Sequence, residues 1–203
     1  VWPSAYIVRD YAELPSNFRC QGTLDAMLKA HGVVGMYDVD TRRLTKTLRE
    51  NGTMNAAVLT SLANVPVEIE ALKQLRNVRP VDKVTCKEPI YWEENPNGKR
   101  VVVWDFGAKN SMITKLHTRG LNTVRVPASY SCEQVLSLKP DGVLLSNGPG
   151  DPTDNPEIIA EIGKLFESGV PIMGICLGHQ LMALSQGAKS TRLLYGHHGA
   201  NQP

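Results

Sequence analysis

The sequence predicts an α/β protein in which a smaller α/β domain precedes a doubly wound, mainly parallel sheet. From residue 100 onward, strand-like runs alternate with helical segments four times, which is typical of βαβ units. The strand-like runs are strongly apolar, as expected for parallel strands whose two faces are covered by helices. Before residue 62 the helix and strand signals are shorter and less regular, and they predict the smaller domain.

Capping residues delimit the helices expected in the first segment. Thr23 precedes apolar residues at helical spacing, and Asp40 or Thr41 caps a second helix that Gly52 ends. The expected order is a helix at 23–32, a strand at 33–39, a helix at 40–52, a strand at 56–60 and a helix at 67–76. The turn-rich stretch 93–99 is the expected linker, so the chain divides into 1–62, a connecting segment 63–98, and 99–203.

The second segment carries the candidate site. Its strands are expected at 100–106, 122–127, 141–145 and 171–176, each followed by a helix. Ligands of doubly wound sheets bind at the carboxyl ends of the strands. Two loops follow strands at that edge, "SNGPGDP" (146–152) and "GICLGHQ" (174–180), and we expect the site there.

The loop around Cys176 has the form Gly-x-nucleophile-x-Gly, with Gly174 and Gly178 on either side. At a sharp strand-to-helix turn the nucleophile is held in a strained backbone conformation, and small neighbours avoid clashes. The amide of Leu177 can then stabilise an oxyanion, and the positive end of the helix favours the thiolate. The alternative is a buried cysteine that serves as a small hydrophobic residue. The glycines and the flanking strand and helix favour the nucleophile.

The loop 146–152 places two glycines around a proline, which makes a rigid turn with exposed backbone amides. Taken alone, it is equally typical of a plain tight turn. Its position beside Cys176 favours a functional role, because the chemistry needs a second oxyanion donor near the thiol.

The two loops, "LSNGPGDP" and "PIMGICLGHQLMAL", together resemble the triad-type glutamine amidotransferases, in which a cysteine attacks the side-chain amide of glutamine and releases ammonia through a thioester. "DVDTRRLTKTLRENGTMNAAVLT", "VVVWDFGAKNSM" and "GHHGANQP" narrow the resemblance to the small subunit of bacterial carbamoyl-phosphate synthetase. The resemblance covers essentially all 203 residues and implies a flavodoxin-like sheet. It implies that 1–62 and 99–203 are the C-terminal part of the N-terminal domain and the N-terminal part of the amidotransferase domain, so that the chain is truncated at both ends.

The resemblance, carried over residue by residue, implies Cys176 as the nucleophile and the main-chain amides of Gly148 and Leu177 as oxyanion donors. The histidine base and the glutamate that orients it are expected beyond this chain. His179 follows Cys176 by three residues, but the family does not use it as the base. The residues implied to bind glutamine are Gly148, Gly150, Leu177, Gln180 and Lys109. For Lys109, a lysine at a helix start in solvent is an equal alternative.

The resemblance also implies partners. The chain would hydrolyse L-glutamine and pass ammonia to the large subunit, in a heterodimer or higher assembly, for carbamoyl phosphate used in arginine and pyrimidine biosynthesis. No cofactor is expected in the chain: it lacks a GxxxxGK[ST] loop, so ATP and Mg²⁺ are expected in the large subunit. Without its base residues the chain alone is expected to be inactive. The alternatives are a non-catalytic scaffold or regulatory subunit, another triad-type amidotransferase, and an unrelated cysteine hydrolase.

Composition argues against several other functions. The net charge of +2 and the absence of like-charge runs give no sign of a nucleic-acid or membrane surface, and no apolar stretch approaches the roughly 20 residues of a membrane span. The four cysteines form no CxxC pair, so free thiols in a reducing cytoplasm are expected rather than a zinc or redox site. His197 and His198 lack a third ligand, and no metal site is expected.

Overall fold

The computed structural model describes residues 3–194, and these form two compact units. The first unit runs to Leu75 and includes the last described residues from Arg192, while the second comprises Arg76–Thr191. The chain therefore first passes from one unit to the other inside the segment 63–98 that the sequence marks as a connection.

The first unit contains a two-stranded parallel sheet, in which β1 pairs with β2. Two of its helices begin at the expected caps. Thr23 Oγ1 accepts the amide of Ala26 at 3.2 Å, and Asp40 Oδ1 accepts the amide of Arg43 at 2.9 Å. Gly52, with a φ of 83°, ends the second of them. The elements are β1 (Ala5–Ile7), α1 (Leu24–Ala30), β2 (Val34–Met36), α2 (Thr41–Asn51), the 3-10 turn η1 (Leu62–Asn64) and α3 (Val65–Gln74).

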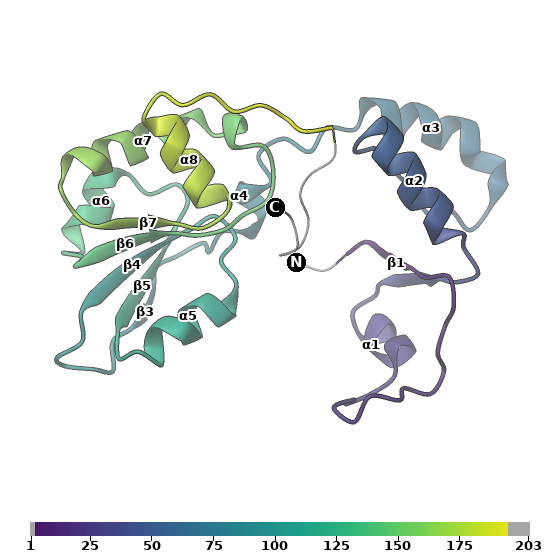
Figure 1. Cartoon of the computed structure of the whole chain (residues 1–203), viewed down its shortest axis with the longest axis horizontal. Helices are drawn as coiled ribbons and strands as arrows, with labels where there is room; N and C mark the ends of the chain where they lie inside the picture. Colours follow the sequence, from purple (N-terminus) through teal and green to yellow (C-terminus); the bar gives the residue numbers. More distant parts are fainter. Residues whose placement is uncertain (1–2, 195–203) are drawn as a thin grey trace. The chain divides into compact units, whose positions relative to one another are not determined.

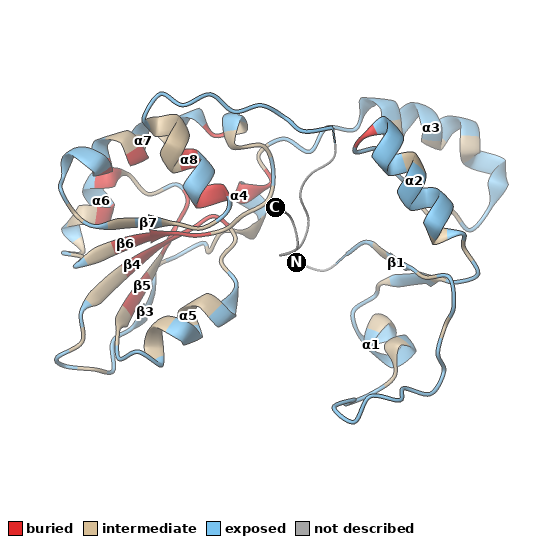
Figure 2. Ribbon diagram, viewed as in Figure 1, coloured by how far each residue is buried: buried red, intermediate tan, exposed pale blue. Residues whose placement is uncertain are grey.

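The strand expected at 56–60 is wrong, because these residues adopt no regular structure. A strand needs a hydrogen-bonding neighbour, and the described part of the first unit offers only the β1–β2 pair, which does not extend to them. Burial is also sparse. Gly52 is the one buried residue in 3–75 and 192–194, as the scarcity of red in that unit of Figure 2 shows.

The second unit is built on a five-stranded sheet with the spatial order β3-β5-β4-β6-β7 (Figure 1). β4 to β7 are parallel, and their order of second, first, third and fourth along the chain is the flavodoxin-like arrangement. The doubly wound prediction is confirmed. The elements are α4 (Val81–Val84), β3 (Ile90–Trp92), β4 (Arg100–Asp105), α5 (Asn110–His117), β5 (Asn122–Pro127), α6 (Cys132–Ser137), β6 (Gly142–Leu145), the 3-10 turn η2 (Pro152–Asp154), α7 (Pro156–Glu167), β7 (Ile172–Gly174) and α8 (Leu177–Ser185).

The edge strand β3 was not predicted from the sequence. It pairs antiparallel with β5, with Tyr91 opposite Val124. Three residues are too few for a hydrophobic period to be recognised, and the partner strand lies far along the chain. In the same stretch, Val81 of α4 is fully buried and belongs to the hydrophobic core of the unit.

Helices α6, α7 and α8 cover one face of the sheet, and α5 lies on the other (Figure 1). The side chains that fill the core on the three-helix side come from both layers. They include Val102, Trp104, Val124, Val126, Val143 and Leu145 from the strands and Val135, Ile158, Ile162, Leu165, Leu177 and Leu181 from the helices. This core fixes the strands whose carboxyl ends carry the two loops.

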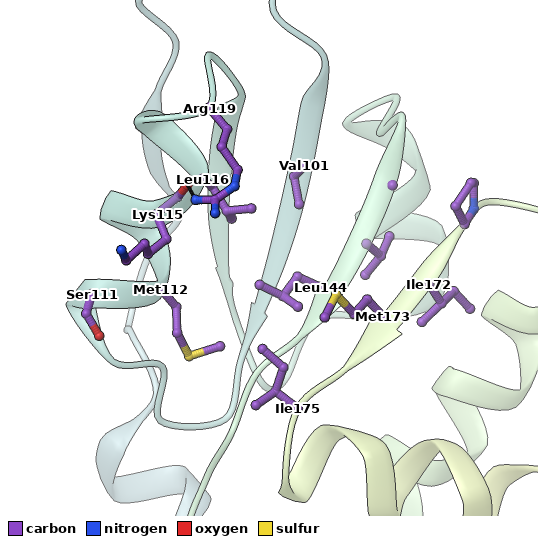
Figure 3. Close-up of a pocket in the computed structure, with 13 residues that line it drawn as sticks. Val101, Ser111, Met112, Lys115, Leu116, Arg119, Leu144, Ile172, Met173 and Ile175 are labelled. Carbon is purple, nitrogen blue, oxygen red and sulfur yellow. Dashed lines mark hydrogen bonds between the residues drawn. The ribbon is translucent and has the colours of Figure 1, made fainter.

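The face that carries α5 has an apolar groove of about 570 Å³ (Figure 3). Leu144 and Met173 line it from the sheet, and Met112 and Leu116 line it from α5. Met173, the middle residue of β7 at the edge of the described sheet, is 63% exposed. The groove lies on a face of the sheet rather than at its carboxyl edge, so it is distinct from the candidate site.

Candidate active site

Cys176 lies between β7 and α8, at the carboxyl edge of the sheet. Its backbone has φ 53° and ψ −111°, a conformation that L-residues other than glycine rarely adopt, and its side chain is exposed. Such strain is held in place only by the surrounding structure and is typical of functional sites. The structure therefore contains the sharp strand-to-helix turn that the glycine spacing predicts, and the buried-cysteine alternative does not fit the exposed thiol.

The glycines beside the turn are required by close backbone approach. A Cβ at Gly174 would lie 2.7 Å from the amide nitrogen of His179, and a Cβ at Gly178 would overlap the carbonyl oxygen of Leu145. The amide of Gly178 donates to the carbonyl of Ser146 at 3.0 Å. The start of α8 therefore packs closely against the end of β6, while Cys176 in the turn before α8 stays exposed.

The two expected oxyanion residues, Gly148 and Leu177, lie against each other. A Cβ at Gly148 would overlap the carbonyl oxygen of Phe106 and lie 2.7 Å from Cδ2 of Leu177. Leu177 is 1% exposed and opens α8, and the first amides of a helix have no partner within it. The loops after β6 and β7 are therefore in contact beside Cys176, although which amides would face a substrate stays a prediction.

The remaining expected glutamine-binding residues lie around the same edge. Gly150 has a φ of 93°, and a Cβ there would lie 2.6 Å from Cγ of Pro80. Gln180 is exposed, and its amide donates to the carbonyl of Cys176 at 3.1 Å. Lys109 is exposed and stands at the N-cap of α5, after β4. A binding role for each stays a prediction.

Asp105 at the end of β4 was not singled out from the sequence. It is fully buried, and its Oδ1 accepts the amides of Gly107 at 2.9 Å and Ala108 at 2.7 Å. Its Oδ2 accepts the amide of Cys86 at 2.7 Å and the Nε–H of Arg125 at 2.8 Å, and the ion pair between them brings Nη2 of Arg125 within 2.7 Å of the same oxygen. Burial favours a higher pKa for this carboxyl, but the amide and Arg125 hydrogen bonds outweigh burial and hold the pKa below its usual range.

The consequence of the Asp105 network is a fixed loop after β4. Gly107, which Asp105 holds, accepts a hydrogen bond from Asn147 Nδ2 at 3.1 Å, so the network extends to the loop 146–152. The available signal in the sequence was an acidic residue at the end of a mostly apolar strand, directly before "FG". A carboxylate at that position must find several donors if it is buried.

The other cysteines have different surroundings. Burial and the nearby Asp105 raise the pKa of Cys86 to about 11. Burial and the neighbouring Glu161 also raise the pKa of Cys132, which is buried at the start of α6. Cys20 is exposed, and its Sγ lies 2.8 Å from the carbonyl oxygen of Gly22. Of the four thiols, that of Cys176 alone stands on a strained turn at the sheet edge.

The described histidines other than His179 have structural partners. His31 Nδ1 lies 2.8 Å from the carbonyl oxygen of Met27, and His117 Nε2 lies 2.7 Å from Thr123 Oγ1. His179 is exposed in the first turn of α8. His197 and His198 fall outside the described residues.

Within residues 3–194, no three or more His, Cys, Asp or Glu side chains gather in a way that could hold a metal ion. Over the same residues, every helix is too short or too polar to cross a membrane.

An exposed cysteine on a strained strand-to-helix turn thus lies at the carboxyl edge of a flavodoxin-like sheet, which is the arrangement that the sequence predicts for a nucleophile. Comparison with known proteins gives the family. The sequence model of "Glutamine amidotransferase class-I" matches residues 102–203, and that of "Carbamoyl-phosphate synthase small chain, CPSase domain" matches residues 1–58. The chain belongs to the class-I glutamine amidotransferase family.

Curated relatives refine this membership. Proteins called carbamoyl phosphate synthase small chain are 45% identical in Oceanobacillus iheyensis and 41% identical in Photorhabdus laumondii, each over 97% of this chain. The one from Xanthomonas campestris is 41% identical over 100% of this chain. The chain spans 53%, 56% and 58% of these three relatives, respectively. The resemblance to the small chain is confirmed over both units.

Proposed function

We propose that the chain forms part of the glutaminase subunit of a carbamoyl-phosphate synthase. The observation that carries the proposal is the strained, exposed Cys176, with Gly148 and Leu177 in contact beside it. The names of the relatives support the assignment to a small chain.

The proposed chemistry begins with attack of the Cys176 thiolate on the side-chain carboxamide carbon of L-glutamine. The main-chain amides of Gly148 and Leu177 stabilise the oxyanion that forms on the carboxamide oxygen. The C–N bond breaks and ammonia leaves, with its extra proton supplied by a general acid. Water then hydrolyses the thioester to glutamate and restores the thiol. Gly150, Gln180 and Lys109 would bind the substrate.

The proposed setting is an assembly with a large chain, a heterodimer or higher oligomer in the cytoplasm. The large chain would bind ATP and Mg²⁺ and convert the ammonia into carbamoyl phosphate for arginine and pyrimidine synthesis. The histidine base and its glutamate would come from outside these 203 residues. A chain of residues 1–203 alone is therefore expected to show no steady-state release of ammonia from glutamine.

The test is Cys176→Ser in a chain of the relatives' full length, assembled with its large chain. Glutamine-dependent synthesis of carbamoyl phosphate should be lost, while synthesis from added ammonia should persist because the two chemistries are separate. Cys20→Ser is the matched control, since that thiol is exposed but lies outside the strand-to-helix turn. Glutamine-dependent synthesis by Cys176→Ser would overturn the proposal. A wild type that uses ammonia but never glutamine would favour the scaffold alternative.

A further inference from the structure

Ser146 directly follows β6 and is fully buried at the carboxyl edge of the sheet. Its amide donates to the carbonyl of Trp104 in β4 at 3.1 Å, and its carbonyl accepts the amide of Gly178 in α8 at 3.0 Å. The main chain of Ser146 therefore connects β4 to α8, the helix that follows the turn at Cys176.

The hydroxyl of Ser146 makes two further bonds. Its Oγ accepts the amide of Phe106 at 2.8 Å and donates to the carbonyl of Asn147 at 2.8 Å. A serine hydroxyl has one proton to donate and can accept at the same time, so both bonds form together. They link the loop that follows β4 to the loop 146–152.

This linkage acts on the proposed oxyanion site through Phe106. The carbonyl of Phe106 lies so close to Gly148 that a Cβ on this glycine would overlap it, and the side chain of Leu177 contacts the same glycine. If the hydroxyl of Ser146 is removed, the buried amide of Phe106 loses its acceptor, and the support beneath Gly148 can shift.

We propose that Ser146 is a positioning residue for glutamine hydrolysis. Its hydroxyl fixes the main chain of Phe106 and Asn147 and thereby holds the Gly148 amide in register with the Cys176 thiol. Ser146 itself does not touch the substrate. The inference rests on the proposed function.

The test is Ser146→Ala in the full-length protein assembled with its large chain. The kcat of glutamine hydrolysis should fall by about 10- to 100-fold, as expected for a small misplacement of a catalytic group. KM should change by less than about 3-fold, because the weakened interaction is made in the transition state. Ser131→Ala is the matched control: it removes a hydroxyl that caps α6 by accepting the amide of Gln134 at 3.2 Å, and it should leave both constants unchanged.

A second readout separates positioning from damage to the nucleophile turn. Alkylation of Cys176 by iodoacetamide forms no oxyanion, so its rate in Ser146→Ala should stay within about 2-fold of wild type. The Cys176 peptide is followed by mass spectrometry, because the exposed Cys20 also reacts. A parallel fall in alkylation and turnover would overturn the proposal.

Ser146→Cys keeps the side-chain shape, with a larger atom at its tip, and supplies a weaker hydrogen-bonding group. It is the second variant to measure if Ser146→Ala does not fold. A lowered kcat at unchanged KM supports the positioning role, and wild-type kcat overturns it. If neither variant folds, Ser146 is a folding residue and the proposal is wrong. A wild-type protein that hydrolyses no glutamine overturns the proposed function itself, whereas an active wild type matched by Ser146→Ala overturns only the role of Ser146.

Discussion

Helix α2 in the first unit and helix α7 in the second unit are kept in place by different means. In the first unit, α2 starts at a side-chain cap and ends at a glycine, yet Leu48 on this helix remains 38% exposed. In the second unit, α7 has no side-chain cap bond, but Leu165 on it is fully buried in a core that includes the sheet. Local capping is sufficient to define α2, whereas the strained turn at Cys176 needs the surrounding core to hold it.

The largest expected effect tests the close packing of the second unit. In Gly178→Ala the added Cβ overlaps the carbonyl of Leu145, so the turn at Cys176 cannot form as described. We expect the free energy of unfolding to fall by about 4 kcal/mol or more, since backbone overlap belongs to the severe class of substitutions. Urea unfolding followed by tryptophan fluorescence measures this, because Trp92 and Trp104 lie in the second unit.

The matched glycine is Gly22 in the first unit, where an added Cβ would have no neighbour within 4 Å. Gly22→Ala should change stability by less than about 0.5 kcal/mol. Similar losses in Gly178→Ala and Gly22→Ala would remove the contrast between the units.

A smaller loss of unfolding free energy is expected when a leucine is replaced by alanine on one helix of each unit. Leu165→Ala should lower the free energy of unfolding by about 3 kcal/mol, because it leaves a cavity in the core. Leu48→Ala has the same helix propensities but removes a partly exposed side chain, and it should cost less than about 1 kcal/mol. Urea denaturation is the measurement, and equal costs would show that the first unit has a core of its own.

The pH dependence of stability provides a finer distinction. The pKa of Asp105 is lower in the folded than in the unfolded chain, so its stabilisation is complete above the unfolded value near 3.8 and is lost as the pH falls through the folded value. Unfolding free energies measured from about pH 5 down to about pH 3 should therefore fall less steeply in Asp105→Asn than in wild type.

The control for the pH experiment is Asp25→Asn. Asp25 pairs with Lys29 at 2.8 Å on the exposed surface of α1, where ion pairs contribute little. This variant should keep the wild-type slope. An unchanged slope in Asp105→Asn would contradict the assigned role of the buried carboxylate.

The smallest effect concerns the caps. Asp40→Ala removes the acceptor for the amide of Arg43 and should cost about 1 kcal/mol, seen as amide exchange about 5-fold faster in α2. Ser131→Ala should lower the free energy of unfolding by a similar amount. Helix α6, however, packs into the core through Cys132 and Val135, so its amides should exchange only when the whole unit unfolds. Hydrogen exchange resolved by peptide distinguishes the two behaviours, and local opening of α6 would blur the contrast.

Much of the fold could be predicted because its signals are local. Thr23, Asp40 and Gly52 delimit helices through hydrogen bonds and backbone conformations within one turn. The apolar run of β4 is long enough to be recognised by itself. By contrast, β3 has only three residues and depends on a distant partner, and the expected strand at 56–60 has the composition of a strand but no partner.

The candidate site divides in the same way. The turn at Cys176 follows from glycines two residues away, which is why its geometry was predictable. Asp105 and Ser146 act through bonds to residues far along the chain: Ser146 binds the amide of Phe106, 40 positions earlier. No local pattern encodes such a bond, so only the folded sheet shows that these side chains brace the loops.

The contact between Leu177 and Gly148 bears on how sequence changes would be tolerated. The proposed donors at both positions are main-chain N–H groups, which no substitution except proline can delete. Mutations can only move them, through a glycine that gains a side chain or a buried neighbour that changes size. A saturation-mutagenesis map of activity should consequently show its most sensitive positions in the residues that pack against the donors, with graded losses at Leu177 that follow side-chain shape rather than polarity.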